Sequence, residues 1–179
     1  MAQKIDRQFA ELDAALEAYI QKKMPAAVVS ALNKAAPLAK TRTIRGTAKR
    51  TKLPQKLIHK RVYNRKASIK TLKAQIRAYV QGVSAIQLKT RDTAKGGWKN
   101  RKGKGVTAKG RRWGNAFIAN TPKGKPHVFQ RKGSARLPIE VVRIDIADDV
   151  QAVAPKAATR IMQQRFPGLL QHEILRRLK

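Results

Sequence analysis

The sequence contains no cysteine, and this excludes disulfide bonds and thiolate metal sites. It also has no apolar run that approaches the length of a membrane-spanning helix, and residues 1–7 lack the apolar core of a signal peptide. We therefore expect a protein made in the cytoplasm, with no membrane partner, that acts there or is packed into a particle assembled there.

Acidic residues are scarce. The chain has 10 Asp and Glu against 41 Lys and Arg, which gives a formal net charge of +31 over 179 residues. Between Ala18 and Arg91 there are 19 Lys and Arg and no acid, so this interval cannot form opposite-charge pairs within itself. Such a charge repels itself and attracts polyanions. The composition favours a nucleic acid, or an acidic protein surface, as partner over a domain whose charge serves only solubility.

Few residues suggest catalysis. His59, His127 and His172 fall in three different predicted elements, without a carboxylate or cysteine at metal-ligand spacing. The carboxylates Glu140 and Asp145 are five residues apart and so point to opposite faces of a strand. We expect a protein that is not an enzyme, with no catalytic residue, metal, cofactor or small-molecule substrate, and His127 as a packed or surface strand residue.

The first third of the chain is predicted to be helical. Residues 4–24 have the spacing of an amphipathic helix, interpreted as packing on its own domain in preference to a partner. Residues 26–50 form a second helix, in which Pro37 predicts a kink near Ala36 or a break, and Gly46 is a candidate end.

A third, short helix should begin at Pro54, with Thr51 as its candidate cap. A last helix should run from about residue 148 to 178 and be bent or divided at Pro155 or Pro167, with Pro167-Gly168 favoured as the break.

Three segments have alternating apolar and polar residues or are bounded by turns that contain Gly and Pro. Both features are typical of the strands of an antiparallel meander, and the three segments are 116–119, 127–131 and 139–146. A half-buried strand is predicted within 68–80, and a weaker one at 85–88. The fold class is therefore α+β: a short antiparallel meander covered on one face by the N-terminal helices and the long, bent C-terminal helix. We expect a single domain over 1–179, with helices in 1–66, the sheet in 68–146 and the last helix in 147–179.

Residues 90–114 are rich in Gly, Lys and Arg, which predicts a mobile basic loop or an irregular hairpin arm. Trp98 and Trp113 lie near its ends, where anchoring is favoured over base stacking. Without a helix-turn-helix, zinc finger or RNA-recognition motif, we expect contact with DNA phosphates, or with an acidic partner, without sequence reading. The candidate contact residues are Arg42, Arg45, Lys49, Arg50, Lys52, Lys56, Lys60, Arg61, Arg65, Lys66, Lys95, Lys99, Arg101, Lys102, Lys104, Lys109, Arg111 and Arg112.

Two patches carry a family resemblance. Residues 116–118, 127–131 and 137–143 resemble the C-terminal half of the minor tail protein Z family of lambda-like phages and prophages, and residues 54–62 with 65–68 resemble its basic helix ahead of the first strand. The likeness extends from about Ala26 to the C-terminus and includes no catalytic motif. The strand residues of the motif are Phe117, His127, Phe129, Gln130, Arg131, Pro138, Val141 and Val142.

The resemblance implies a structural tail-completion protein at the head-proximal end of a long non-contractile tail, needed for head joining and for placement of the DNA end. It implies a virion location, a homo-oligomer in the form of a hexameric ring, and tail terminator or head-completion proteins as partners, with the tape-measure protein as a further candidate. The basic residues would contact double-stranded DNA without sequence specificity.

The alternative is a sequence-nonspecific nucleic-acid-binding protein of ribosomal or nucleoid type. The charge and the basic loop fit it equally well, but the order of the two patches favours the tail protein. An enzyme such as a basic nuclease ranks third, because the sequence has no visible metal-binding carboxylate cluster.

Overall fold

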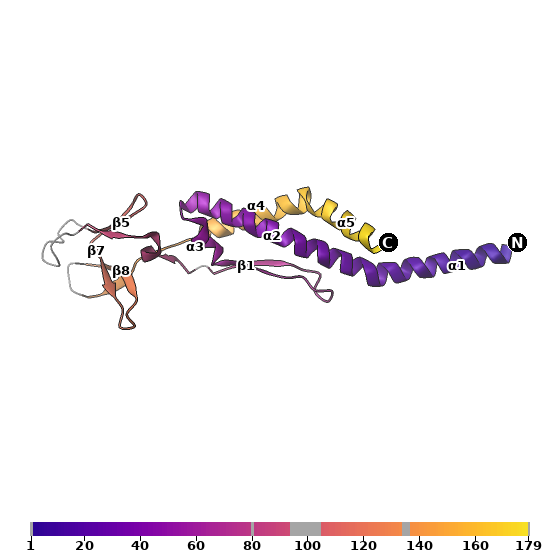
Figure 1. Ribbon diagram of the computed structural model, residues 1–179, viewed down its shortest axis with the longest axis horizontal. Helices are drawn as coiled ribbons and strands as arrows, with labels where there is room; N and C mark the ends of the chain where they lie inside the picture. The colour runs from indigo at the N-terminus through magenta and orange to yellow at the C-terminus, as the bar shows by residue number, and fades with distance from the viewer. Residues whose placement is uncertain (1, 80, 94–104, 134–136, 179) are drawn as a thin grey trace. The chain divides into compact units, whose positions relative to one another are not determined.

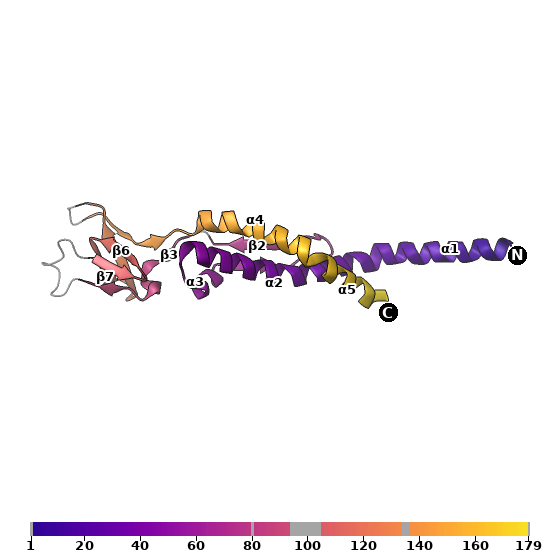
Figure 2. The same ribbon diagram turned by 90° about the horizontal axis from the view of Figure 1, so that it is seen from above.

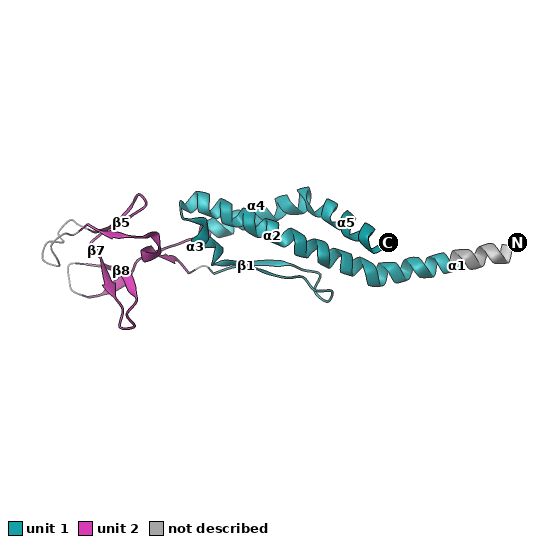
Figure 3. Cartoon of the chain, in the orientation of Figure 1, with its two compact units in different colours: residues 1–79, 149–179 teal, residues 80–148 magenta. Residues whose placement is uncertain are grey.

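The computed structural model describes residues 2–79, 81–93, 105–133 and 137–178, with side chains from residue 10 onward. The chain forms two compact units, the first made of residues 1–79 with 149–179 and the second of residues 80–148 (Figure 3). Helices and small antiparallel sheets are both present, so the predicted α+β class is confirmed. The single domain expected from the sequence stays a prediction.

One continuous helix begins the first unit (Figure 1). It consists of α1 (Ala2–Ala18), a π-helical turn over Tyr19–Lys23, and α2 (Met24–Thr51). The helix does not break at Pro37, so of the two predicted outcomes there only the kink stays a prediction. It also does not end at Gly46, and that prediction is wrong. Pro37 lies on the exposed side, and Gly46 lies against another helix, so the gain from packing α2 exceeds the local cost of both residues.

The buried face of α2 is a stripe of small residues at every fourth position, which lets neighbouring elements approach closely. Two of its threonine hydroxyls form hydrogen bonds within the helix: Thr43 Oγ1 donates to the Ala39 carbonyl at 2.9 Å, and Thr51 Oγ1 to the Thr47 carbonyl at 2.8 Å. The hydroxyl of Thr47 is buried without a hydrogen-bond partner. Thr51 is therefore the last residue of α2 and not the predicted cap of the next helix. The stripe consists of Ala27, Ala31, Ala35, Ala39, Thr43, Thr47 and Thr51.

The C-terminal helices run antiparallel to α2 along its length (Figure 2). They are α4 (Ala147–Gln164) and α5 (Phe166–Leu178), separated at Arg165. The predicted division is therefore present, but it lies two residues before Pro167-Gly168, and both of these residues are inside α5. Contacts from one end of α2 to the other join Ala26 to Arg177, Lys34 to Glu173, Ala35 and Ala39 to Ile161, Gly46 to Val153, and Arg50 to Asp149.

A hairpin of β1 (Val62–Arg65) and β2 (Gln75–Ala78) packs on α2 within the same unit. The side-chain amide of Asn33 on α2 holds the chain beyond β1 by donating to the Ala67 carbonyl at 3.1 Å and accepting from the Ala67 N–H at 2.7 Å. The predicted short helix is α3 (Gln55–His59), with Pro54 before it. Strand β1 was not predicted, because the sequence assigned residues 1–66 to helices.

The second unit contains the meander. Strands β7 (Ala116–Asn120), β8 (Pro126–Arg131) and β9 (Ile139–Val141) pair in that order, which confirms the three predicted strands, although the third is shorter. The chain leaves β9 at Val142, and β10 (Arg143–Ile144) pairs with β3 (Val83–Ser84) instead.

Residues 85–88, predicted as a strand, form a 3₁₀ turn, η2 (Ala85–Leu88), so that prediction is wrong. Inside this unit the apolar residues of the meander pack on η2 and on β5 (Gly105–Ala108), whereas the sequence predicted the helices as their cover. The core cluster consists of Ala85, Val106, Ala116, Val128 and Val142.

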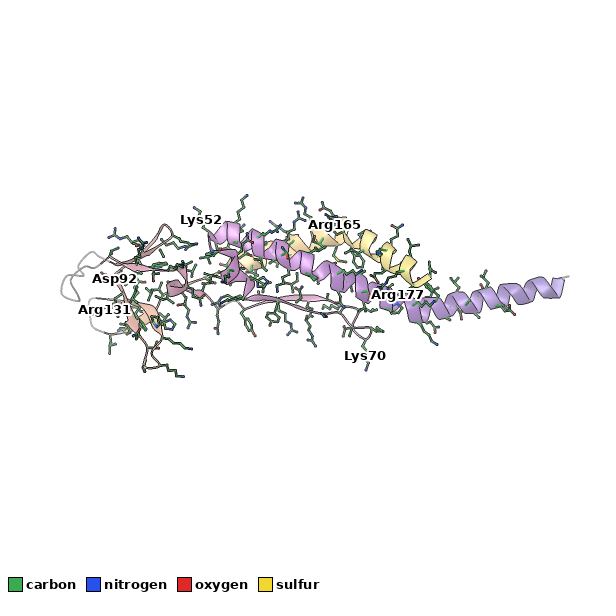
Figure 4. All side chains as sticks on the ribbon, viewed as in Figure 1. Lys52, Lys70, Asp92, Arg131, Arg165 and Arg177 are labelled. Carbon is green, nitrogen blue, oxygen red and sulfur yellow. The ribbon has the colours of Figure 1, made fainter. Side chains whose placement is uncertain are left out.

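One carboxylate is buried at the junction of α2 and α5. Glu173 is the only fully buried charged side chain among the described residues, and it forms ion pairs with Lys34 at 2.6 Å, with Arg176 at 3.0 Å and with Arg177. Hydrogen bonds from Lys34 and then Arg177 hold its pKa well below the ordinary value, at about 2. Figure 4 labels Arg177 where α5 lies beside α2.

Glu173→Gln should lower the free energy of unfolding at pH 7 by about 3 kcal/mol, because it leaves cations facing a neutral buried group. Since the folded pKa lies below the unfolded one, the contribution of the carboxylate is complete above pH ~4.3 and is lost as the pH falls toward 2. Denaturant unfolding at pH 7, 4 and 3 should therefore show the difference between wild type and variant shrinking with acid. The exposed pair of Glu140 and Lys132 gives the control: Glu140→Gln should cost less than about 1 kcal/mol. A wild type and Glu173→Gln of equal stability at pH 7 would contradict the assignment.

Gly46 leaves room for α4. A Cβ there would lie 2.5 Å from Val153 Cγ1, while a Cβ on Gly168 of α5 would meet nothing within 4 Å. Gly46→Ala should therefore destabilise the protein by about 1 to 2 kcal/mol in thermal unfolding, despite the better helix propensity of alanine. Gly168→Ala should not destabilise it, and Val153→Ala should rescue Gly46→Ala in the double variant. Equal effects of the two alanine substitutions would contradict this packing.

Candidate polyanion-binding surface

Three of the candidate cations share one face of α2, and a fourth, Lys52, follows the last residue of the helix. Arg42, Arg45 and Lys49 are spaced by three and four residues, which places them on one side of a helix. Arg42 is half-buried and the others are exposed. Lys52 adopts a left-handed conformation with φ 53° at the end of α2 (Figure 4). The buried stripe of α2 thus leaves a row of cations on the solvent side.

The other candidates of the first unit follow this helix in the chain. Lys56, Lys60, Arg65 and Lys66 are exposed on or after α3 and β1, and Arg61 is half-buried. The guanidinium of Arg50 is already neutralised in part, since its Nε lies 2.8 Å from Asp149 Oδ1.

In the second unit, five cations line one hollow of about 470 Å³. Three were predicted from the sequence: Lys109, Arg111 and Arg112. Lys89 and Arg91 were missed, although they flank the first residue of the predicted basic loop, and that proximity was the available signal.

A tight hairpin positions these cations. Strands β5 and β6 (Arg111–Gly114) are joined by Lys109 and Gly110, both with positive φ (45° and 76°), as a two-residue type I′ turn requires. Strand β4 (Arg91–Asp92) pairs with the other edge of β5 and so brings Arg91 beside the hairpin. The hairpin arm predicted as one alternative for this region is therefore present over residues 105–114.

Part of the predicted loop lies outside the described residues. This applies to Trp98 and to five candidate contact residues, which are Lys95, Lys99, Arg101, Lys102 and Lys104. Trp113 is among the described residues and is half-buried against the core cluster, in keeping with the predicted anchoring.

The aromatic residues of the family motif form a packed cluster on the meander. The rings of Phe117 and Phe129 lie opposite each other with centroids 5.9 Å apart, and the Arg131 guanidinium lies 5.6 Å from the Phe117 centroid. His127 is half-buried. Its ring and that of Phe129 are in a T-shaped arrangement with centroids 6.2 Å apart, and its Nδ1 lies 3.4 Å from Ser84 Oγ. These contacts are structural in kind.

The remaining motif residues connect the strands to their neighbours. Gln130 Nε2 donates to the Gly114 carbonyl at 3.0 Å, and the Val142 N–H donates to the Val128 carbonyl at 2.8 Å. Val141 lies opposite Phe129, and Pro138 follows Leu137 through a cis peptide bond ahead of β9.

Within the described part of the chain, no three His, Asp or Glu side chains come together as a metal site would require. Nor is any described helix both long and apolar enough to cross a membrane.

The fold and the composition are those of a strongly basic α+β protein with cations gathered on one face of α2 and around one hollow of the second unit. The chain belongs to the family described as Prophage minor tail protein Z (GPZ), whose family model matches residues 12–179, and the resemblance found in the sequence is thereby confirmed. Family membership supports a structural role in the completion of a phage tail and a place in the virion.

Two relatives are similar over most of the chain. One is the "Tail completion protein" of Escherichia phage N15, 29% identical over 144 residues, which are 78% of this chain and 78% of the relative. Another is the "Tail completion protein Z" of Escherichia phage lambda, 29% identical over 166 residues, which are 84% of this chain and 86% of the relative. No solved structure matches the chain.

Two glycines of the β5–β6 hairpin allow a test of its register, because one is crowded and the other is open. Gly105 and Gly114 face each other in the register, but a Cβ on Gly105 would lie 1.9 Å from the Trp113 carbonyl oxygen, while one on Gly114 would meet nothing within 4 Å. Gly105→Ala should break the β5–β6 pairing, and Gly114→Ala should leave it intact. Amide hydrogen exchange in residues 105–114 measures this. Full protection retained in Gly105→Ala would contradict the register.

Proposed function

We propose that this protein completes the head-proximal end of a long non-contractile tail, and that it supports head-tail joining and placement of the DNA end through its basic surface. The family match over residues 12–179 carries the proposal. The named relatives are tail completion proteins, and the match to each covers more than three quarters of both chains.

The mechanism we propose is electrostatic and not catalytic. The row of cations on α2 and the hollow of the second unit would contact the phosphates of double-stranded DNA or an acidic neighbouring ring. A contact of this kind releases counterions and does not depend on base sequence.

The partners in this proposal are copies of the same chain and neighbouring tail proteins. A hexameric ring would match the sixfold symmetry of a tail and would meet tail terminator or head-completion proteins, with the tape-measure protein below. The formal charge of +31 on each copy would be concentrated in such a ring, so DNA or acidic neighbours must offset it.

Binding to a duplex of arbitrary sequence tests the DNA contact. Fluorescence anisotropy with the full chain over a range of salt concentrations should give a logarithm of the binding constant that falls linearly with the logarithm of salt, by about 0.9 for each phosphate neutralised. Replacing Lys89, Arg91 and Lys109 together by Gln should weaken binding on all sequences and lower the slope by about 2 to 3.

A matched control removes the same charge elsewhere in the second unit. Lys123, Lys125 and Arg143 are exposed and do not line the hollow, so their joint replacement by Gln should change the slope much less. Equal loss in the two triple variants would show that the hollow is not the contact. Absence of salt-dependent binding in the unaltered protein would overturn the DNA part of the proposal.

A further inference from the structure

An apolar stripe on α1 has no cover. All described side chains from residue 10 to residue 18 are exposed, and among them Leu12 and Leu16 are 63% and 55% accessible. Ile20, in the π-helical turn, is 53% accessible and continues the same spacing of four residues. Three large aliphatic side chains in line on one helix face are typical of a docking surface, not of a solvated helix. The sequence-based interpretation placed this face against its own domain.

The same unit contains an apolar groove of about 320 Å³ between α2, β2 and α4. Most of its lining consists of alanine, whose short side chains leave the space between the backbones of α2, β2 and α4 largely unfilled. Met162, 42% accessible, lies at its edge. The lining includes Ala35, Ala39, Ile76, Ala158, Ile161 and Met162.

The stripe and the groove have the same length. From Leu12 to Ile20 an α-helix rises by about 12 Å, and from Ala154 to Met162 of the groove it rises by the same amount. The groove therefore offers space along α4 for the three aliphatic side chains of one helix face.

The stripe cannot reach the groove of its own chain. α1 and α2 are parts of one continuous helix, and the groove is lined by residues 32–39 of that same helix (Figure 1). A continuous helix does not fold back on its own side. The helix that fills the groove must come from another molecule.

Charge identifies that molecule as a second copy. Residues 8–21 contain Glu11, Asp13 and Glu17 and no Lys or Arg, in a chain that otherwise carries a large positive excess. Next to lining residues of the groove, Lys73 and Lys156 are exposed. An acidic helix that docks between basic edges lowers the repulsion between two copies of a strongly cationic protein.

We propose that α1 of one copy docks its Leu12, Leu16 and Ile20 face into the α2–β2–α4 groove of the next copy. The contact joins two different surfaces, so it is heterologous and either closes into a ring or continues as a filament. This inference rests on the homo-oligomeric ring proposed above, and it names the two surfaces that join its neighbours.

Thiol cross-linking tests the contact directly, because the chain has no cysteine of its own. Single variants Leu12→Cys, Leu16→Cys and Ile20→Cys are each mixed with Met162→Cys and treated with a short bifunctional maleimide. At least one mixture should give a cross-linked dimer that neither variant gives alone. Ile69→Cys, at a site 61% accessible and outside the groove lining, replaces Met162→Cys in the control and should give none.

The mass of the assembly that the full chain forms in solution provides a second test of this contact. Light scattering should show an assembly that Leu16→Glu reduces to monomers and Ile69→Glu leaves intact, with circular dichroism confirming that both variants are folded. Cross-links of Leu16→Cys to itself in place of the mixed pair would mean that α1 pairs with α1, and would overturn the inference. An assembly of unchanged mass without mixed cross-links would overturn it too while leaving the proposed ring standing. The DNA measurement is independent of both results.

Discussion

The helical unit depends on the ion pairs of Glu173. Its carboxylate lies between α2 and α5 and binds Lys34, Arg176 and Arg177 at once. Arg177 continues the contact, with its Nη2 donating to the Ala26 carbonyl at 3.1 Å and to Ser30 Oγ at 2.7 Å. Because α2 itself has no acid, the C-terminal helices must supply the counter-charge. Asp149 does the same for Arg50 near the other end of α2, so the two pairs set the antiparallel register of α2 against α4 and α5.

This use of acidic residues has a consequence for the surface. Ten acids cannot neutralise 41 cations, and two of the ten are engaged in holding helices together. The positive charge that remains in excess therefore needs anions from outside the chain. A tail-completion protein placed beside packaged DNA and other tail proteins would find them there. The acidic, apolar α1 offers a further source, from a neighbouring copy.

The sequence predicted the elements whose signals are local. Alternation and Gly-Pro turns identified the meander strands, and Pro167 marked the division between α4 and α5. Prediction from the sequence failed where contacts between residues far apart in the chain decide the local structure. Gly46 was predicted to end a helix, but its contact with Val153 of α4 keeps it inside α2. Residues 85–88 were predicted as a strand, but they form a 3₁₀ turn that packs on the meander.

The candidate site was predictable in part for the same reason. Lys109, Arg111 and Arg112 are close in sequence and meet at one hollow, whereas Lys89 joins them through the fold of η2 and β4. The site of Glu173 had only part of its signal in the local sequence, because Arg176 and Arg177 follow it by three and four residues on α5, whereas Lys34 lies 139 residues away. Long-range ion pairs of this kind cannot be read from spacing along one element.

A reconstruction of the head-to-tail joint of an intact particle that encodes the protein would test whether this chain completes the head-proximal end of a phage tail. We expect a ring of this chain at the end of the tail, beside the DNA, with the cations of α2 or of the second unit toward phosphates or an acidic neighbour. A complete, DNA-filled particle whose joint contains no copy of this chain would contradict it.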